Sequence, residues 1–277
     1  MSWRYVEARD IDAPLPRRIL GLWRHRRLLR RMAERDLRQR YAGSTIGYLW
    51  AAVYPLLFVA LYTVIFTTVF RGRLSPGGAP QEYALHVVAG LLPWVAFSEV
   101  AGRATQAMAE HRNLVKFAVF PIQVLPLTAL YTTAFSQVAG LIALIGIAVW
   151  SRGAVAPSLA LLLPTIALQV VFLAGIAWLL GAAGAVLRDV RELVSIALMA
   201  GMFLTPIFYT DADTPRLLRP LVELNPLTHL IRLYRDALLG GPVHATSFVI
   251  FAVVACVTFL AGYVAFERTR AFLSDIL

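Results

Sequence analysis

The fold is decided by one stretch of the chain, Arg38-Gln39-Arg40-Tyr41-Ala42-Gly43-Ser44-Thr45-Ile46-Gly47-Tyr48-Leu49-Trp50. An arginine-dense segment precedes it, and no charged residue occurs between Ile46 and Arg71. Because a helix rises about 1.5 Å per residue, residues 46–70 are long enough to cross the roughly 30 Å hydrocarbon core of a bilayer with some tilt. The stretch therefore predicts a basic segment that leads directly into a membrane crossing.

The composition is that of a polytopic membrane protein. Of the 277 residues, 59% are hydrophobic and 15% are charged, whereas soluble domains average about 25% charged residues. The net charge of +10 is better explained by the enrichment of Lys and Arg in cytoplasmic loops than by nucleic-acid binding, so we expect no nucleic-acid partner. The single cysteine, Cys256, excludes an intrachain disulfide and a thiolate metal cluster.

Hydropathy divides the chain into two parts and predicts an all-α integral membrane protein. Residues 1–45 form a cytoplasmic segment in which apolar residues recur near 3.6-residue spacing among arginines, a pattern typical of an amphipathic helix in the headgroup plane. Residues 46–277 form a transmembrane domain with six crossings, at about 46–70, 83–107, 121–150, 157–187, 193–209 and 243–266. Most of the 26 basic residues then fall on one side of the membrane, which predicts cytoplasmic termini.

Residues 210–242 predict an outer re-entrant or surface-lying helical hairpin between the last two crossings. Asn225 suits a helix N-cap, Pro226 suits the first helical position, and Gly240 suits the end. Arginines in this part would be costly against lipid tails. We expect some of them to contact an acidic polymer or a lipid phosphate at an outer gate, unless they only reach the headgroups; they are Arg216, Arg219, Arg232 and Arg235.

Two patterns within the crossings predict how the helices pack. Glu99 and Arg103 lie four residues apart, so they can pair on one helix face, and we interpret them as a structural pair at the inner end rather than a proton relay. Small residues gather near the inner end of the fourth crossing and allow helix backbones to approach closely; among them are Gly175, Gly181 and Gly184.

The sequence lacks the motifs of a nucleotide-binding chain or a hydrolase. Its only lysine, Lys116, lies between Val115 and Phe117, which excludes a phosphate-binding loop of the form G-x-x-x-x-G-K-[ST]. If ATP drives this protein, another chain must bind it. The histidines show no metal-ligand spacing, so we expect no metal, no cofactor and no catalytic residue in this chain.

Four short motifs occur in a fixed order along the chain. They are Arg40-Tyr41 followed by Gly47 and Trp50, Leu187-Arg188-Asp189-Val190, Thr205-Pro206-Ile207-Phe208-Tyr209, and Asn225-Pro226-Leu227. In order and spacing they resemble the motifs of permease subunits of ABC polysaccharide exporters, which move capsular polysaccharide, O-antigen or teichoic acid across the inner membrane. The resemblance covers residues 40–277, with Leu187 at a position where that family has Phe.

The resemblance implies a homodimeric permease in the bacterial inner membrane, bound to two copies of a separate ATPase subunit that holds ATP and Mg²⁺. It implies that a polysaccharide on a lipid anchor passes between the two chains. We expect capsule or O-antigen as the cargo, with periplasmic or outer-membrane export proteins as further partners. The resemblance also implies an interface helix that includes Arg38, Arg40 and Tyr41, and an ATPase-coupling helix, Glu110-His111-Arg112-Asn113-Leu114-Val115-Lys116-Phe117.

An aromatic residue occurs at every fourth position of the first crossing. Because four residues turn a helix by about 400°, the rings follow a slowly winding stripe. Sugar C–H faces stack on aromatic rings, so the stripe could line a channel for a glycan, but the rings could equally pack on neighbouring helices or face lipid. The channel-lining candidates are Trp50, Tyr54, Phe58 and Tyr62.

Two rival functions remain open, as does a scaffold with no transport activity. An ABC exporter of a drug or small lipid would have the same six crossings but a closed apolar interface in place of a polar, aromatic channel. An integral-membrane glycan-modifying enzyme would need clustered carboxylates or histidines near a membrane surface. Asp211, Asp213 and Glu223 are close in sequence, although acidic residues in a turn are ordinarily only solvated.

Overall fold

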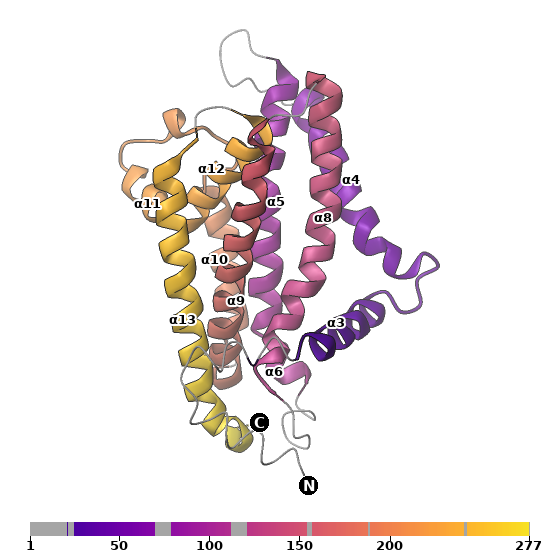
Figure 1. The fold of residues 1–277 in the computed structure, drawn as a ribbon, viewed down its shortest axis with the longest axis vertical. Helices are drawn as coiled ribbons and strands as arrows, with labels where there is room; N and C mark the ends of the chain where they lie inside the picture. The colour runs from indigo at the N-terminus through magenta and orange to yellow at the C-terminus, as the bar shows by residue number, and fades with distance from the viewer. Residues whose placement is uncertain are drawn as a thin grey trace.

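The computed structural model describes residues 21, 25–69, 79–111, 121–153, 157–187, 189–240 and 243–276, and within these ranges it contains helices and turns but no strand. The helices form an elongated bundle (Figure 1). In chain order they are α3 (Arg26–Arg40), α4 (Trp50–Val64), α5 (Pro80–Ala104), α6 (Ala107–Glu110), α8 (Val124–Arg152), α9 (Leu162–Val186), α10 (Val190–Leu204), α11 (Arg219–Leu224), α12 (Pro226–Leu239) and α13 (Ala245–Ile276).

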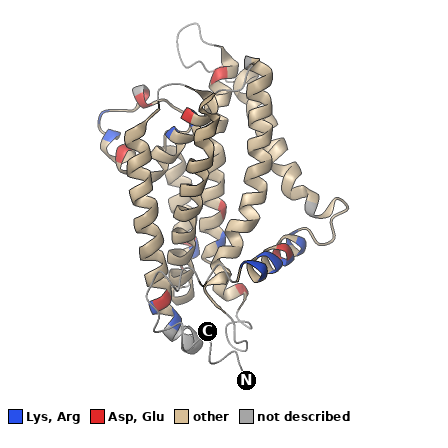
Figure 2. Ribbon diagram, in the orientation of Figure 1, with Lys and Arg blue, Asp and Glu red and all other residues tan. Residues whose placement is uncertain are grey.

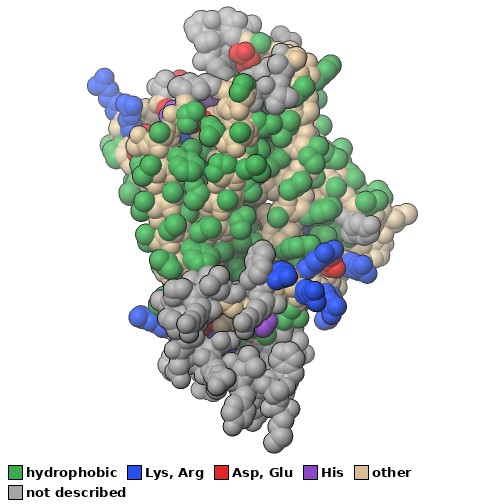
Figure 3. Space-filling view, viewed as in Figure 1, with side chains coloured by type: hydrophobic (Ala, Val, Ile, Leu, Met, Phe, Trp, Pro, Cys, Tyr) green, Lys and Arg blue, Asp and Glu red, His purple; other side chains and the backbone are tan. Residues whose placement is uncertain are grey.

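Five helical segments of the described chain are long and apolar enough to cross a membrane: Trp50–Val69, Pro80–Ala104, Val124–Ser151, Pro157–Val186 and Ala245–Arg270. They coincide with five of the six predicted crossings. Hydrophobic side chains cover the flank of the bundle between its two ends, and arginines gather at the end that carries α3 (Figures 2 and 3). The chain is therefore a multi-pass membrane protein.

The predicted fifth crossing, residues 193–209, corresponds to the shorter helix α10. This helix has 15 residues and ends at Leu204, because Pro206 lacks an N–H and holds Thr205 in an extended conformation, with φ −86° and ψ 137°. Fifteen residues span only about 22 Å at 1.5 Å per residue. The fifth crossing, and with it a total of six, therefore stays a prediction.

Helix α3 lies across the direction of the long helices at one end of the bundle (Figure 1), which we call the α3 end. It packs on α8, and Ala33 on its packed face is fully buried. Most of its other side chains are charged (Figure 2). Residues Arg26–Arg40 of the predicted N-terminal helix are thus helical, residues 17–20 and 22–24 lie outside the described ranges, and the position of the helix in a headgroup plane remains a prediction.

Helices α9 and α13 touch through their backbones. A Cβ atom added to Gly175 would overlap the carbonyl oxygen of Thr258, and one added to Gly262 would overlap the carbonyl oxygen of Gly175. Gly184 packs in the same way on the carbonyl of Thr105, at the end of α5. The prediction that small residues allow close helix approach is confirmed at these positions.

Helix α12 is buried at the opposite end of the bundle, which we call the α12 end (Figure 1). It contacts α5, α9 and α13. As predicted, Asn225 is the N-cap, and its Oδ1 accepts a hydrogen bond of 3.0 Å from the Leu227 N–H; Pro226 is the first helical residue. Gly240 ends the helix with φ 72°, a conformation that favours glycine. The burial of α12 favours a re-entrant path over a surface-lying one, and that path stays a prediction.

Candidate functional site

The first candidate site joins α3 to the rest of the bundle at the α3 end. The Glu99 carboxylate on α5 lies 2.5 Å from the Arg40 guanidinium and 3.8 Å from that of Arg103. The predicted pairing of Glu99 with Arg103 is confirmed, while the shorter contact with Arg40 could not be inferred from the sequence. Arg103 also donates to the Thr132 hydroxyl on α8 at 2.5 Å. One carboxylate therefore links α3, α5 and, through Arg103, α8.

A second contact ties α3 to the predicted coupling segment. His111 Nε2 lies 3.6 Å from the Asp36 carboxylate of α3, and His111 Nδ1 lies 3.1 Å from the Ala107 carbonyl. Both side chains are largely buried. The hydrogen bond with Asp36 raises the pKa of His111 above its ordinary value, although burial opposes the shift. This end of the segment is thus held against α3.

Of the predicted coupling helix, the structure describes only Glu110 and His111. Glu110 is the last residue of α6 and is exposed. The other six residues, Arg112 to Phe117, lie outside the described ranges. The interface-helix candidates are described: Arg38 is exposed, Arg40 is exposed and pairs with Glu99, and the Arg40 guanidinium lies 5.7 Å from the Tyr41 ring centroid.

The outer-gate arginines fall into two groups. Arg232 is buried, and its guanidinium binds both carboxylate oxygens of Glu223, at 2.6 and 2.8 Å, and the Asp211 carboxylate at 2.9 Å. Arg235 donates to the backbone carbonyls of His86 and Ile207, at 3.2 and 2.9 Å. These two side chains therefore hold the α12 end together, while Arg216 and Arg219 are exposed and form no ion pair with any described residue.

The three acidic residues considered for an enzyme site, Asp211, Asp213 and Glu223, have partners within the chain. Asp211 and Glu223 bind Arg232, and the Arg232 hydrogen bonds hold the pKa of Glu223 below its usual value. Asp213 accepts hydrogen bonds from the side chain and backbone N–H of Thr210 and caps a short turn. Among the described residues, no group of three or more His, Cys, Asp and Glu could hold a metal ion. Asp211, Asp213 and Glu223 therefore bind other side chains at this end of the bundle.

The aromatic stripe does not form one uniform surface. The Tyr54 ring is 64% exposed, whereas Phe58 and Tyr62 are half-buried, with ring centroids 4.3 Å apart. The stacking continues from Tyr62 to Phe66, and Phe66 contacts Phe208. Trp50 is half-buried at the start of α4. At Phe66 the stripe is buried and packs on a neighbouring segment, whereas Tyr54 is the most exposed of the described stripe residues.

The polar contacts between helices inside the bundle were not predicted from the sequence. Gln137 of α8 donates to Gln169 of α9 at 2.8 Å and to the Tyr234 hydroxyl of α12 at 2.5 Å, and Tyr234 also bonds Gln169. Near the start of α13, His244 lies 2.8 Å from the Asp236 carboxylate. A glutamine within an apolar crossing is itself a signal, because lipid offers it no partner and a neighbouring helix must.

Comparison with known proteins identifies the family. Residues 27–239 match the membrane component described as ABC-2 type transporter. The chain belongs to the ABC-2 type transporter family. The match spans α3 through α12, so both ends of the bundle described above are part of the family's common region.

Several proteins of named function are similar to this chain over most of its length. The O-antigen export system permease protein RfbA of Myxococcus xanthus is 30% identical over 79% of this chain and 83% of its own length. RfbA of Klebsiella pneumoniae is 28% identical over 89% of this chain and 93% of its own length. The polysialic acid transport protein KpsM of Escherichia coli is 27% identical over 85% of this chain and 90% of its own length. The predicted resemblance to polysaccharide-export permeases is confirmed.

Proposed function

We propose that the chain is the membrane-spanning subunit of an ATP-driven exporter that moves a lipid-anchored polysaccharide, O-antigen or capsule, across the bacterial inner membrane. The observation that carries this proposal is the near full-length similarity to permeases of O-antigen export and polysialic acid transport. The multi-pass bundle and the long apolar helices agree with it. The distribution of basic residues supports termini in the cytoplasm.

ATP hydrolysis belongs to a separate subunit in this proposal. The sequence has no phosphate-binding loop, and two copies of an ATPase would dock on the segment Glu110–Phe117 of two identical permease chains. The contact between His111 and Asp36 and the contact between Glu99 and Arg40 connect that docking segment and α5 to α3. Movement of the ATPase would thereby reach the membrane helices through α3 and α5.

Reconstituted transport tests the proposal. The chain is purified with its cognate ATPase, placed in proteoliposomes and supplied with a radiolabelled lipid-linked glycan. We expect protection of the glycan from an external glycosidase, or its release to the far leaflet, only with ATP and an active ATPase. An ATPase whose catalytic residue is replaced is the matched control.

The rival cargo is examined in the same vesicles. A fluorescent short-chain lipid without a glycan should not be moved at a rate above the ATP-free background. ATP-dependent movement of that lipid together with an immobile lipid-linked glycan would replace the proposal by a small-lipid exporter.

A further inference from the structure

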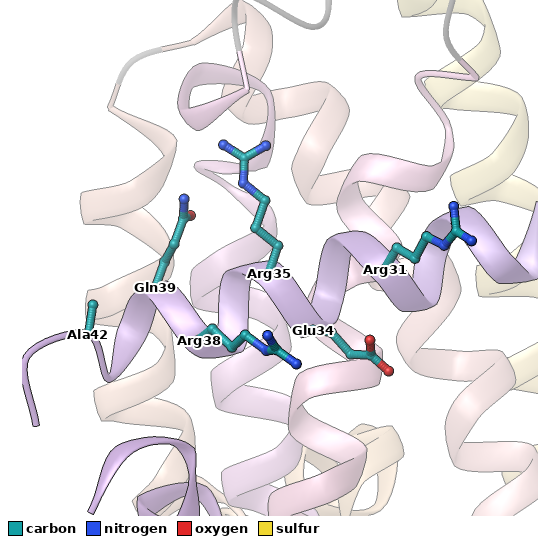
Figure 4. Close-up of a pocket in the computed structure, with 6 residues that line it drawn as sticks. All are labelled: Arg31, Glu34, Arg35, Arg38, Gln39 and Ala42. Atoms are coloured by element: carbon teal, nitrogen blue, oxygen red, sulfur yellow. The ribbon is translucent and has the colours of Figure 1, made fainter. Parts of the chain in front are cut away.

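A shallow cavity of about 520 Å³ runs along one face of α3 (Figure 4). We call it the α3 groove, and it is lined by Arg31, Glu34, Arg35, Arg38, Gln39 and Ala42. The guanidinium groups of Arg31 and Arg35 and the amide of Gln39 extend from the same side of the helix in Figure 4. The spacing of four and three residues between the arginines explains why all three line one groove.

The positive charge of the α3 groove is not neutralised within the described chain. Arg31, Arg35 and Arg38 are exposed, and none of them forms an ion pair with a described residue. The one acidic residue of the groove, Glu34, already accepts a 2.6 Å hydrogen bond from Arg30, which lies outside the groove lining. The groove thus presents the guanidinium groups of Arg31 and Arg35 on one side and that of Arg38 on the side of Glu34 (Figure 4), and Arg30 already binds this single carboxylate.

The α3 groove is held in place by the contacts on either side of it. Ala33 is fully buried on the packed face of α3, Arg40 binds Glu99, and Asp36 contacts His111. These contacts fix the helix axis before any ligand arrives. A site fixed in this way loses less conformational entropy when a ligand binds, so affinity gains from the preorganisation.

The position of α3 indicates which kind of ligand the α3 groove would bind. The helix lies across the direction of the long helices and is followed closely by α4, which begins at Trp50 and is the first apolar segment long enough to cross a membrane. We expect a basic helix in this position to lie at the boundary between hydrocarbon and water. Groups at that boundary that carry negative charge are lipid phosphates, and planar guanidinium groups bind phosphate oxygens in pairs.

We propose that the α3 groove is a discrete binding site for the phosphate of an anionic phospholipid, held by Arg31, Arg35 and Arg38. The bound lipid completes the surface between α3 and the start of α4. This differs from diffuse attraction of a basic helix to a charged membrane, because only the three groove arginines, and not the other arginines of α3, determine the affinity. The inference does not depend on the transported polymer.

Lipid titration of the purified full-length chain in detergent, followed by native mass spectrometry, tests this site. The probes are phosphatidylglycerol, phosphatidylcholine and inorganic phosphate. We expect one tight phosphatidylglycerol molecule per chain, weaker phosphatidylcholine because choline masks its phosphate, and no measurable competition from millimolar inorganic phosphate. Equal affinity for the two lipids, or displacement of the lipid by inorganic phosphate, would overturn the assignment to an anionic phospholipid.

A matched pair of variants separates the site from general charge. Arg35→Gln/Arg38→Gln removes two groove arginines, and Arg26→Gln/Arg27→Gln removes two exposed arginines of the same helix that do not line the groove. We expect the tight affinity to fall about tenfold or more in the first variant, since each lost charge-assisted bond is substantial, and to change less than about twofold in the second. Equal weakening in both variants would overturn the proposal.

A charge-preserving variant covers the case in which the glutamine variant does not fold. Arg35→Lys/Arg38→Lys keeps the net charge but removes the paired donors of the guanidinium groups. We expect a several-fold weaker tight site in this variant with an unchanged elution volume. An unchanged affinity would show that the groove recognises charge alone and would contradict the proposed site.

Discussion

The Arg40 guanidinium lies 2.5 Å from the Glu99 carboxylate and joins α3 to α5 across 59 positions of sequence. Glu99 also lies 3.8 Å from Arg103, which bonds Thr132 of α8. Glu99 is therefore the acceptor on which the attachment of α3 to α5 depends.

Replacement of Glu99 by Gln should destabilise the protein by about 1 kcal/mol, because two guanidinium groups lose their shared carboxylate while Arg40 remains partly hydrated. Thermal unfolding of the purified chain in detergent measures the change. The control is Glu34→Gln, which removes the exposed pair with Arg30 on α3 and should cost less than about 0.5 kcal/mol. Equal effects of the two substitutions would contradict a linking role for Glu99.

The contact between His111 and Asp36 predicts a pH-dependent contribution to stability. The hydrogen bond from Asp36 raises the pKa of folded His111 above 6.5, against the effect of burial. Because the folded pKa exceeds the unfolded one, the contribution is complete below about pH 6.5 and is lost as the pH rises through the raised value.

The difference in melting temperature between the native chain and His111→Gln measures that contribution. We expect the difference to be largest under acidic conditions and to shrink as the pH rises above about 6.5. Asp36→Asn should reproduce the same profile, since it removes the other partner. A difference that stays constant across this range would show that protonated His111 does not stabilise the fold.

The glycine contacts between α9 and α13 should tolerate no side chain. Gly175→Ala places a Cβ on the Thr258 carbonyl, so the helices must separate, at a cost of roughly 1–3 kcal/mol or more. Gly146→Ala in α8 is the matched control, because no atom lies within 4 Å of its added Cβ and alanine favours helix. The yield of monodisperse protein and its melting temperature distinguish the two; comparable values would disprove the close approach.

Replacement of a buried arginine at the α12 end should destabilise the protein, whereas replacement of the exposed arginines should not. Arg232→Gln leaves the carboxylates of Asp211 and Glu223 without their shared partner, and we expect a loss of about 1–3 kcal/mol in the free energy of unfolding. Adding Glu223→Gln to this variant should recover part of the loss. A single variant as stable as the native chain would show that this ion pair adds nothing.

Arg216→Gln/Arg219→Gln should leave the melting temperature unchanged, since both side chains are exposed. If they contact an acidic polymer at the outer gate, export of an acidic glycan in the reconstituted system should fall several-fold while export of a neutral glycan is kept. Equal export of both glycans by the variant would assign these residues to the headgroup region instead.

Within the aromatic stripe, Tyr54 is the best test of a channel surface. Its ring is 64% exposed, so Tyr54→Ala should cost less than about 0.5 kcal/mol in stability. A lower export rate would then indicate contact with the glycan, and a native rate with normal expression would remove Tyr54 from the channel. Phe58→Ala is the packing control, because loss of its contact with Tyr62 should lower the melting temperature.

Local rules predicted much of the fold. Apolar runs located five spanning segments, and Asn225 and Pro226 gave the start of α12 to the residue. The spacing of Glu99 and Arg103 predicted their pairing, which the structure confirms. Each of these features depends on residues within one helical turn or one hydrophobic segment, and such information is present in any short window of the sequence.

The remaining contacts depend on which helices become neighbours. The sequence alone could not show that Arg40 reaches Glu99, that Asp36 reaches His111, or that Arg232 is buried between two acids. Periodicity predicted the aromatic stripe but left open which rings are exposed; Tyr54 is exposed, and Phe58 packs against Tyr62. Each of these contacts depends on which helices pack against each other in the folded bundle.

The backbone contact of α9 with α13 limits how this protein can change shape. Where Gly175 and Gly262 meet, no layer of side chains separates the two helices. Packed helices ordinarily slide past each other by repacking the side chains that lie between them. Because α9 and α13 have no such side chains between them at this point, they must move as one rigid unit. A conformational cycle would therefore require the other segments to move around this pair.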